Sequence, residues 1–245
     1  MRADAFLDAV AEAPLVDLDA LTGGRGLVVL APHPDDESLG CGGLIAEAVS
    51  CGRAVRLLVL TDGAASHPLS EALTGAMLRD IREAETLAAA AALGLAPDHV
   101  AFLRLPDAAA PSTGPEADRV VRAVRDAVRD GDAGAVFTTW RHDPHCDHEA
   151  AAFILDRATP LPGDARAFAF TVWGRALPPE TEVGAPKGAV RIDVSAHREA
   201  KKRAVLAHVS QTVGLPGEHA AGFRLDPAMI DRLCGPSEAY WEHAP

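Results

Sequence analysis

The sequence predicts an α/β fold built around a mostly parallel sheet. Short apolar runs bounded by glycine and proline alternate with longer segments that have helical spacing, which is the pattern of repeated βαβ units. Polar residues able to carry chemistry follow several of these apolar runs. In open α/β sheets ligands bind beyond the carboxyl ends of the strands, so we expect these residues to meet at one edge of the sheet.

The elements of the first half of the chain follow from apolar patterns and stop signals. Residues 26–30 form a continuous apolar run, which indicates a strand buried on both faces. Gly52 and Gly94 stand where two helical patterns end. The predicted elements are strand 26–30, helix 39–49, strand 54–60 and helix 76–93.

The second half of the chain repeats the alternation. The predicted elements are strand 100–105, helix 115–129, strand 133–139, helix 148–156 and strand 165–173, followed by a strand at 189–194 and a helix at 197–210. No serine- and glycine-rich linker interrupts them. We therefore expect one domain over residues 1–245, with a core at about 25–212 and a C-terminal extension over 213–245.

Composition and charge exclude several classes of function. The 245 residues are 48 % hydrophobic, which suffices for one large core. The formal net charge of −12 and the lack of a basic block argue against nucleic-acid partners and against a membrane-surface helix. No apolar stretch is long enough to span a bilayer, and early charged residues argue against a signal peptide. We therefore expect a cytoplasmic protein with reduced cysteines; a homo-oligomer is left open.

The first polar cluster directly follows the first predicted strand. One imidazole and three carboxylates fall within five positions, at His33, Asp35, Asp36 and Glu37. Groups this close would repel one another unless a cation lay among them. Aspartates that follow a strand often cap the next helix. Helix capping alone, however, does not explain why a histidine lies beside these aspartates or why a second polar cluster follows another strand. For Glu37, a role beside the ligands and a role at the helix N-terminus are equally favoured.

The second cluster follows the fourth predicted strand and contains three histidines at every third position, His142, His145 and His148. His33, Asp36 and His148 together give two imidazoles and one carboxylate, a set typical of catalytic zinc with an open position, although ferrous iron would suit it equally. Asp35 would then face the bound water rather than the ion. His142 is either a ligand or a rim residue, and we favour the rim.

Seven short motifs make the chain resemble the PIG-L (LmbE-like) family of zinc-dependent de-N-acetylases. They appear in the family's order and spacing over residues 25–212. They are Pro32-His33-Pro34-Asp35-Asp36-Glu37, Leu39-Gly40-Cys41-Gly42-Gly43, Thr61-Asp62-Gly63, Arg82-Glu83-Ala84-Glu85 with Leu93-Gly94, Leu105-Pro106-Asp107, His145-Cys146-Asp147-His148 and His208-Val209-Ser210-Gln211.

The resemblance implies a Rossmann-like three-layer sandwich and removal of an N-acetyl group from an N-acetylglucosamine-type amino-sugar derivative. It also implies roles for seven side chains: zinc ligands at His33, Asp36 and His148, a general base at Asp35, an oxyanion or carbonyl contact at His145, and sugar contacts at Arg82 and Asp107. Zinc would lower the pKa of its bound water towards about 7, and Asp35 would take the proton as that water attacks the amide.

The chain departs from the family pattern at two positions. Cys146 replaces a proline and Ala108 replaces a glycine. We expect Cys146 to be a small, partly buried thiol rather than a ligand. An amidase acting on thiol-sugar conjugates and a non-catalytic sugar- or metal-binding module remain alternatives; a base at Asp35 argues against the module.

Several other residues have plain structural interpretations. The glycines at 40, 42 and 43 lack the dinucleotide-binding pattern and favour close packing of a helix on a strand. We expect His67 and His99 on the surface. Arg82 and Glu85 could form an ion pair on the helix surface, although a sugar contact for Arg82 is slightly favoured.

Overall fold

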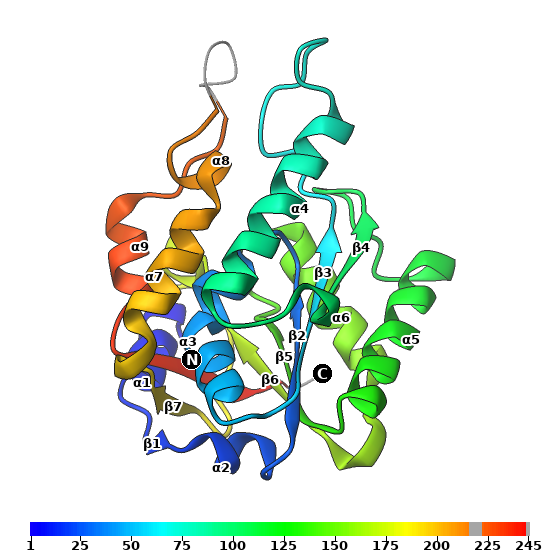
Figure 1. Ribbon diagram of the computed structural model, residues 1–245. Helices are drawn as coiled ribbons and strands as arrows, with labels where there is room; N and C mark the ends of the chain where they lie inside the picture. Colours follow the sequence, from blue (N-terminus) through cyan, green and yellow to red (C-terminus); the bar gives the residue numbers. More distant parts are fainter. Residues whose placement is uncertain (216–221, 244–245) are drawn as a thin grey trace.

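Figure 1 shows the computed structural model, which describes residues 1–215 and 222–243. A central sheet carries helices on both faces. Its strands are β1 (Leu15–Val16), β2 (Gly26–Ala31), β3 (Val55–Thr61), β4 (Val100–Leu105), β5 (Ala133–Thr139), β6 (Arg166–Phe170), β7 (Val190–Asp193) and β8 (Ser237–Glu242).

Across the described residues these strands form one eight-stranded sheet in the order β1-β7-β8-β6-β5-β2-β3-β4. Neighbours from β6 to β4 pair in parallel, as do β1 and β7. Strand β8 runs antiparallel to both β6 and β7. The mostly parallel sheet predicted from the sequence is therefore confirmed, with one antiparallel strand inside it.

The helices cover the two faces of the sheet. They are α1 (Ala3–Ala11), α2 (Leu18–Thr22), α3 (Asp36–Ser50), α4 (Gly75–Ala92), α5 (Gly114–Asp130), α6 (Cys146–Ala158), α7 (Arg198–Ala207), α8 (Val209–Thr212) and α9 (Pro227–Leu233). None of the helices in the described residues is long and apolar enough to cross a membrane.

The core lies in two layers because alternate residues of a strand point to opposite faces. Leu27 and Val29 of β2 belong to the cluster that includes residues of α3 and α7. Val28 and Leu30 belong to the cluster formed with α5 and α6. The three-layer, Rossmann-like arrangement expected from the resemblance is thus confirmed.

Most predicted elements lie within one to three residues of those observed, but three points differ. Helix α3 begins at Asp36 and α6 at Cys146, so each polar cluster runs from a loop into the first turn of a helix. The predicted helix 197–210 is broken at His208 into α7 and α8.

The ends of the chain contain elements that the sequence analysis did not predict. These are α1, β1, α2, α9 and β8. The predicted C-terminal extension contains β8, which pairs with β6 on one side and β7 on the other. Its six residues carry only a short alternating pattern, so their place in the sheet depends on partners far away in the sequence.

Candidate metal centre and active site

The two polar clusters meet at the carboxyl ends of the parallel strands, as the strand order predicts. The loop after β2 carries His33 and Asp35, the turn after β4 carries Asp107, and the segment after β5 carries His145. A cavity of about 370 Å³ opens there. Six of the seven predicted site residues line it, namely His33, Asp35, Asp36, Arg82, Asp107 and His145. His148 is fully buried beside this cavity.

Three side-chain atoms converge tightly at the inner end of the cavity. Asp36 Oδ2 lies 3.1 Å from His33 Nδ1 and 3.2 Å from His148 Nε2. The two imidazole nitrogens are 3.3 Å apart. Ligand atoms of a tetrahedral zinc ion are separated by about 3.3–3.6 Å. The donor types and their spacing therefore fit a divalent metal ion.

The other nitrogen of each imidazole is held by carboxylates. His33 Nε2 lies 3.1 Å from Asp147 Oδ2 and 3.3 Å from Asp107 Oδ1. His148 Nδ1 lies 2.9 Å from Asp143 Oδ2. Such partners fix the tautomer and orientation of a metal-binding histidine. Nδ1 of His33 and Nε2 of His148 are thereby left to face Asp36.

Asp143 was not given a role by the sequence analysis, although it lies within the second cluster. It is buried, and Thr171 Oγ1 donates to its Oδ1. The backbone N–H groups of Val172 and Trp173 donate to its carboxylate at 2.9 and 3.1 Å. The only sequence feature that points to a role for Asp143 is its position five residues before His148. The sequence pattern does not show that its partners lie in the segment after β6.

Asp35 occupies a strained position at the start of α3. Its φ angle is 141°, in a region that favours glycine. Such strain at a non-glycine residue is concentrated at functional sites. Burial raises the pKa of the Asp35 carboxyl to about 6, against the lowering effect of the Arg82 charge. A carboxylate with a pKa near neutrality is well suited to accept a proton.

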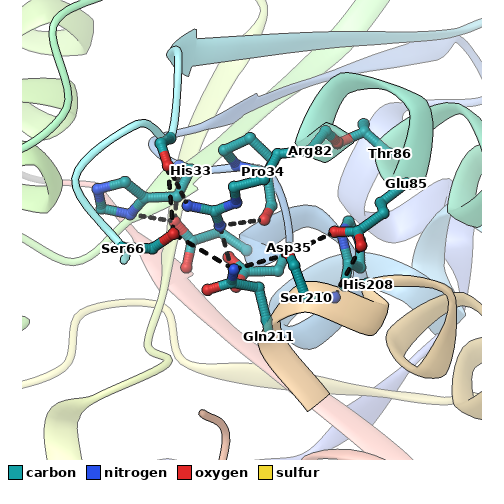
Figure 2. Close-up of polar contacts among 12 residues, drawn as sticks. His33, Pro34, Asp35, Ser66, Arg82, Glu85, Thr86, His208, Ser210 and Gln211 are labelled. Carbon is teal, nitrogen blue, oxygen red and sulfur yellow. Dashed lines mark hydrogen bonds and ion pairs between the residues drawn. The ribbon is translucent and has the colours of Figure 1, made fainter. Parts of the chain in front are cut away.

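Arg82 is buried and clamps the loop that carries Asp35. Its guanidinium donates to the carbonyl oxygens of Pro34 at 2.6 Å and Gly63 at 3.0 Å, and lies 3.4 Å from Asp35 Oδ2 (Figure 2). Glu85, one turn along α4, instead accepts from the N–H and hydroxyl of Ser210 at 2.7 Å. The alternative of an ion pair between Arg82 and Glu85 on the helix surface is therefore wrong.

Glu37 supports the same loop from inside the protein. Its carboxylate accepts from the Asp35 N–H at 3.0 Å and lies 3.0 Å from Nε2 of the buried His208. Burial would raise the pKa of Glu37, but His208 and Ser38 outweigh it and lower that pKa. Glu37 thus makes contacts of both predicted kinds, because it bonds the N–H of the N-cap residue of α3 and lies beside the loop that carries the cluster.

His145 lies at the mouth of the site, with its ring 4.4 Å from that of His33. Burial and the neighbouring His33 lower the pKa of its imidazole, so the neutral form is favoured. Its Nδ1 accepts the Asp147 N–H at 3.2 Å. In the neutral ring Nε2 therefore carries the proton and is available as a hydrogen-bond donor.

The remaining predicted residues lie elsewhere or differ from expectation. His142 packs its ring 5.1 Å from Trp140 and lines a separate cavity rather than the candidate site, so the structure places it neither among the proposed ligands nor at the rim of that site. Cys146 is exposed, with Sγ 3.5 Å from the Ala108 carbonyl oxygen, so the prediction of a partly buried thiol is wrong. His67 is 4 % exposed, so its predicted surface position is also wrong.

The glycines after the first cluster have the packing role that the sequence predicted. A Cβ added to Gly40 would meet Phe170 of β6 at 2.2 Å, and one added to Gly43 would meet Val194 at 2.6 Å. Helix α3 can approach the sheet only because these positions lack side chains. This close approach places Asp36 at the end of β2.

Together, the sheet, the cavity at its carboxyl edge and the cluster of histidines and aspartates define an α/β protein with a site whose side chains could hold a metal ion. The model of the PIG-L family, described as GlcNAc-PI de-N-acetylase, matches residues 28–159. The chain therefore belongs to the PIG-L family, as its motifs predicted. No curated protein matches the chain.

Solved structures share the fold over most of its length. A conserved protein of Thermus thermophilus is 28 % identical, with a TM-score of 0.60, over 85 % of this chain and 84 % of its own. The N,N'-diacetylchitobiose deacetylase of Pyrococcus horikoshii is 22 % identical, with a TM-score of 0.60, over 87 % and 80 %. The 4-carboxy-2-hydroxymuconate hydratase of Pseudomonas putida is 20 % identical, with a TM-score of 0.59, over 75 % and 78 %. Since one fold carries both reactions, the site has to decide the function.

Proposed function

We propose that this protein is a metal-dependent hydrolase that removes the N-acetyl group from an N-acetylglucosamine-type amino-sugar derivative. The observation that carries the proposal is the triangle of His33, Asp36 and His148 donor atoms beside the buried, strained carboxylate of Asp35. Membership of the PIG-L family and the fold shared with a chitobiose deacetylase support it.

His33, Asp36 and His148 would hold the ion, with zinc favoured and ferrous iron an alternative for the same donor set. When bound, such an ion supplies Lewis-acid activation of water and of the acyl carbonyl. Asp107, Asp143 and Asp147 keep both imidazoles in the tautomer that presents a free nitrogen. This support explains why so many carboxylates lie within one small site.

Asp35 acts as the general base in this proposal. With a pKa of about 6 it is ionised at neutral pH and takes a proton from the attacking water. The same proton can then pass to the departing amine. Arg82 and Glu37 position Asp35 through the Pro34 carbonyl oxygen and the Asp35 N–H.

His145 supports the reacting carbonyl. The neutral ring donates from Nε2, which stabilises negative charge developing on the acyl oxygen. It lines the cavity with Trp173 and Phe223, whose rings lie 5.6 Å apart and give one wall an apolar face for a sugar. We keep Arg82 and Asp107 as sugar contacts, since both line the cavity.

The deciding experiment pairs elemental analysis of the purified protein with amine release from N-acetylglucosamine and a panel of its glycosides, with and without chelator. We expect one bound zinc or iron and chelator-sensitive amine release. Asp35→Asn should keep the metal and lose turnover, whereas His148→Ala should lose both. A protein that binds no metal after reconstitution would contradict the ligand assignment.

The same panel separates the alternatives. Bound metal with amine release only from other acyl groups or from thiol-sugar conjugates would identify the amidase. Sugar binding without release from any of these amides would identify a binding module and overturn the proposal. Full activity of Asp35→Asn would show that another group is the base.

A further inference from the structure

A second cavity lies behind the candidate active site and shares none of its lining residues. Its volume is about 240 Å³, and α1, β7, the end of α9 and the start of β8 surround it. These elements lie on one side of the molecule in Figure 1. Three arginines line it, the exposed Arg175 and Arg232 and the half-buried Arg191.

These three arginines have no acidic partner among the residues that the structure describes. Within residues 1–215 and 222–243, no carboxylate lies within 4.0 Å of any of their guanidinium nitrogens. Only Arg191 makes a hydrogen bond there, from Nε to the Ala13 carbonyl oxygen at 2.7 Å. In a chain with a net charge of −12, arginines such as Arg53, Arg104 and Arg141 pair with carboxylates instead. Three arginines that lack a carboxylate partner among the described residues therefore line this one cavity.

The one carboxylate in the cavity wall is already neutralised. Glu238 accepts from Lys201 Nζ at 2.6 Å and from the Tyr240 hydroxyl at 2.8 Å. It also accepts from the N–H groups of Gly43 and Leu44 at 2.7 and 2.8 Å. Because four donors satisfy it, Glu238 does not cancel the charge of the arginines, and the cavity remains positive.

We propose that this cavity binds a small metabolite through an oxyanion, either phosphate or carboxylate. Planar guanidinium groups pair with such oxyanions through two parallel hydrogen bonds. A volume of about 240 Å³ exceeds the space of a few water molecules, so the cavity has room for a ligand larger than inorganic phosphate. The nearby apolar side chains of Leu7, Val10 and Trp241 would contact its uncharged part.

The cavity also touches the segment that supports the metal cluster. Thr171 and Val172 line the cavity, and both donate hydrogen bonds to Asp143, which in turn holds His148. Arg175 follows in the same segment. We therefore expect the bound anion to change turnover through this segment, a consequence that rests on the proposed deacetylase function.

Binding itself can be tested without turnover. Isothermal titration calorimetry of the full, metal-loaded chain would use inorganic phosphate, glucose 6-phosphate and citrate as probes. We expect saturable binding of the probe. The affinity should fall roughly tenfold or more in the double variant Arg175→Gln, Arg232→Gln, since each substitution removes a charge-assisted hydrogen bond to the anion. The control is Arg203→Gln, an exposed arginine of α7 outside the cavity, which should bind as the wild type does.

The outcomes separate the ligand sources and the two proposals. Tighter binding of glucose 6-phosphate than of citrate identifies a phosphorylated ligand, and the reverse order identifies a polycarboxylate. Equal affinity in the wild type and the double variant would place the anion elsewhere, for instance at the metal centre, and would overturn the proposal, as would no binding of any probe. A protein without amidase activity would still give these results, so failure of the proposed function is recognised separately.

Discussion

At the scale of single residues, the candidate site is held together by compensating charges. Asp36 lies between His33 and His148, and further carboxylates hold the far side of each ring. Burial alone would lower the pKa of the His148 imidazole, but Asp36 and Asp143 outweigh it and raise that pKa to about 9. Without a metal, therefore, protons on the histidines balance these acids, and a bound cation would replace them.

Replacing Asp143 tests this support directly. Asp143→Asn removes the charge that faces His148 Nδ1 while keeping the size of the side chain. We expect metal affinity to fall about 10- to 100-fold, because the partner of a ligating histidine sets its orientation and basicity. Competition with a chromophoric chelator measures this, and Asp98→Asn, at an exposed position far from the cluster in sequence, is the control. Unchanged affinity would show that Asp143 serves the fold alone.

The charge of Arg82 sets the pH range in which Asp35 can act. Burial raises the pKa of Asp35 and the Arg82 charge lowers it, with a net value of about 6. A base must be ionised, so kcat/KM should fall as the pH drops through this pKa. Removing the charge in Arg82→Gln should raise the pKa and move the acid limb to higher pH.

The pH profile of kcat/KM measures the position of this limb. Arg82→Lys retains the positive charge. We expect the acid limb of its kcat/KM profile to stay near that of the wild type, even though the hydrogen bonds of the guanidinium group are lost. A limb that stays in place or moves to lower pH in Arg82→Gln would contradict the assignment of Asp35 as the base.

At the scale of elements, the packing of α3 places the first cluster. The helix begins at Asp36 and its glycines allow close approach to β6 and to the segment after β7. Strand β2 ends just before the loop that contains the strained residue Asp35, so strand, turn and helix together determine where the carboxylates point.

A methyl group at Gly40 should disturb this packing. Its Cβ would lie 2.2 Å from the ring of the buried Phe170, so the ring or the helix would have to shift. We expect Gly40→Ala to lower stability by about 1–3 kcal/mol, the usual cost of overpacking. Thermal unfolding measures the loss. The matched control is Gly75→Ala at the start of α4, where the nearest atom lies at 3.6 Å and little change is expected.

At the scale of the whole molecule, the C-terminal strand joins two parts of the sheet. Strand β8 lies between β6 and β7, and Glu238 at its start bonds α3 and α7. Lys201 is 1 % exposed, and Glu238 is the carboxylate that pairs with its ammonium group among residues 1–215 and 222–243.

Removing one partner of this buried pair should be more harmful than removing both. Glu238→Ala leaves the Lys201 charge buried and unpaired, for which we expect a loss of about 3–5 kcal/mol. The double variant Glu238→Gln, Lys201→Met should be more stable than Glu238→Ala, because no uncompensated charge remains. Denaturant unfolding with both variants checks this, and equal stabilities would show that the ion pair is not the cause.

The sequence by itself predicted the parallel core and the edge where the polar residues meet. Strands such as 133–139 carry long apolar runs, and glycines mark helix ends, so local pattern is sufficient there. His33, Asp36 and His148 could also be predicted, because each lies at the end of a predicted strand or the start of the next helix. The side chains that hold these three residues in place could be predicted only in part.

Only the tertiary structure decided how distant segments complete the site and the sheet. Asp143 is held by residues after β6, His208 reaches Glu37 across 171 positions, and Glu238 lies 195 positions from Gly43. Local spacing cannot encode such pairings, because they depend on the order of strands in the sheet and on which buried polar groups need a partner. The sequence therefore determined which titratable and metal-binding side chains are present, and the fold determined which groups support them.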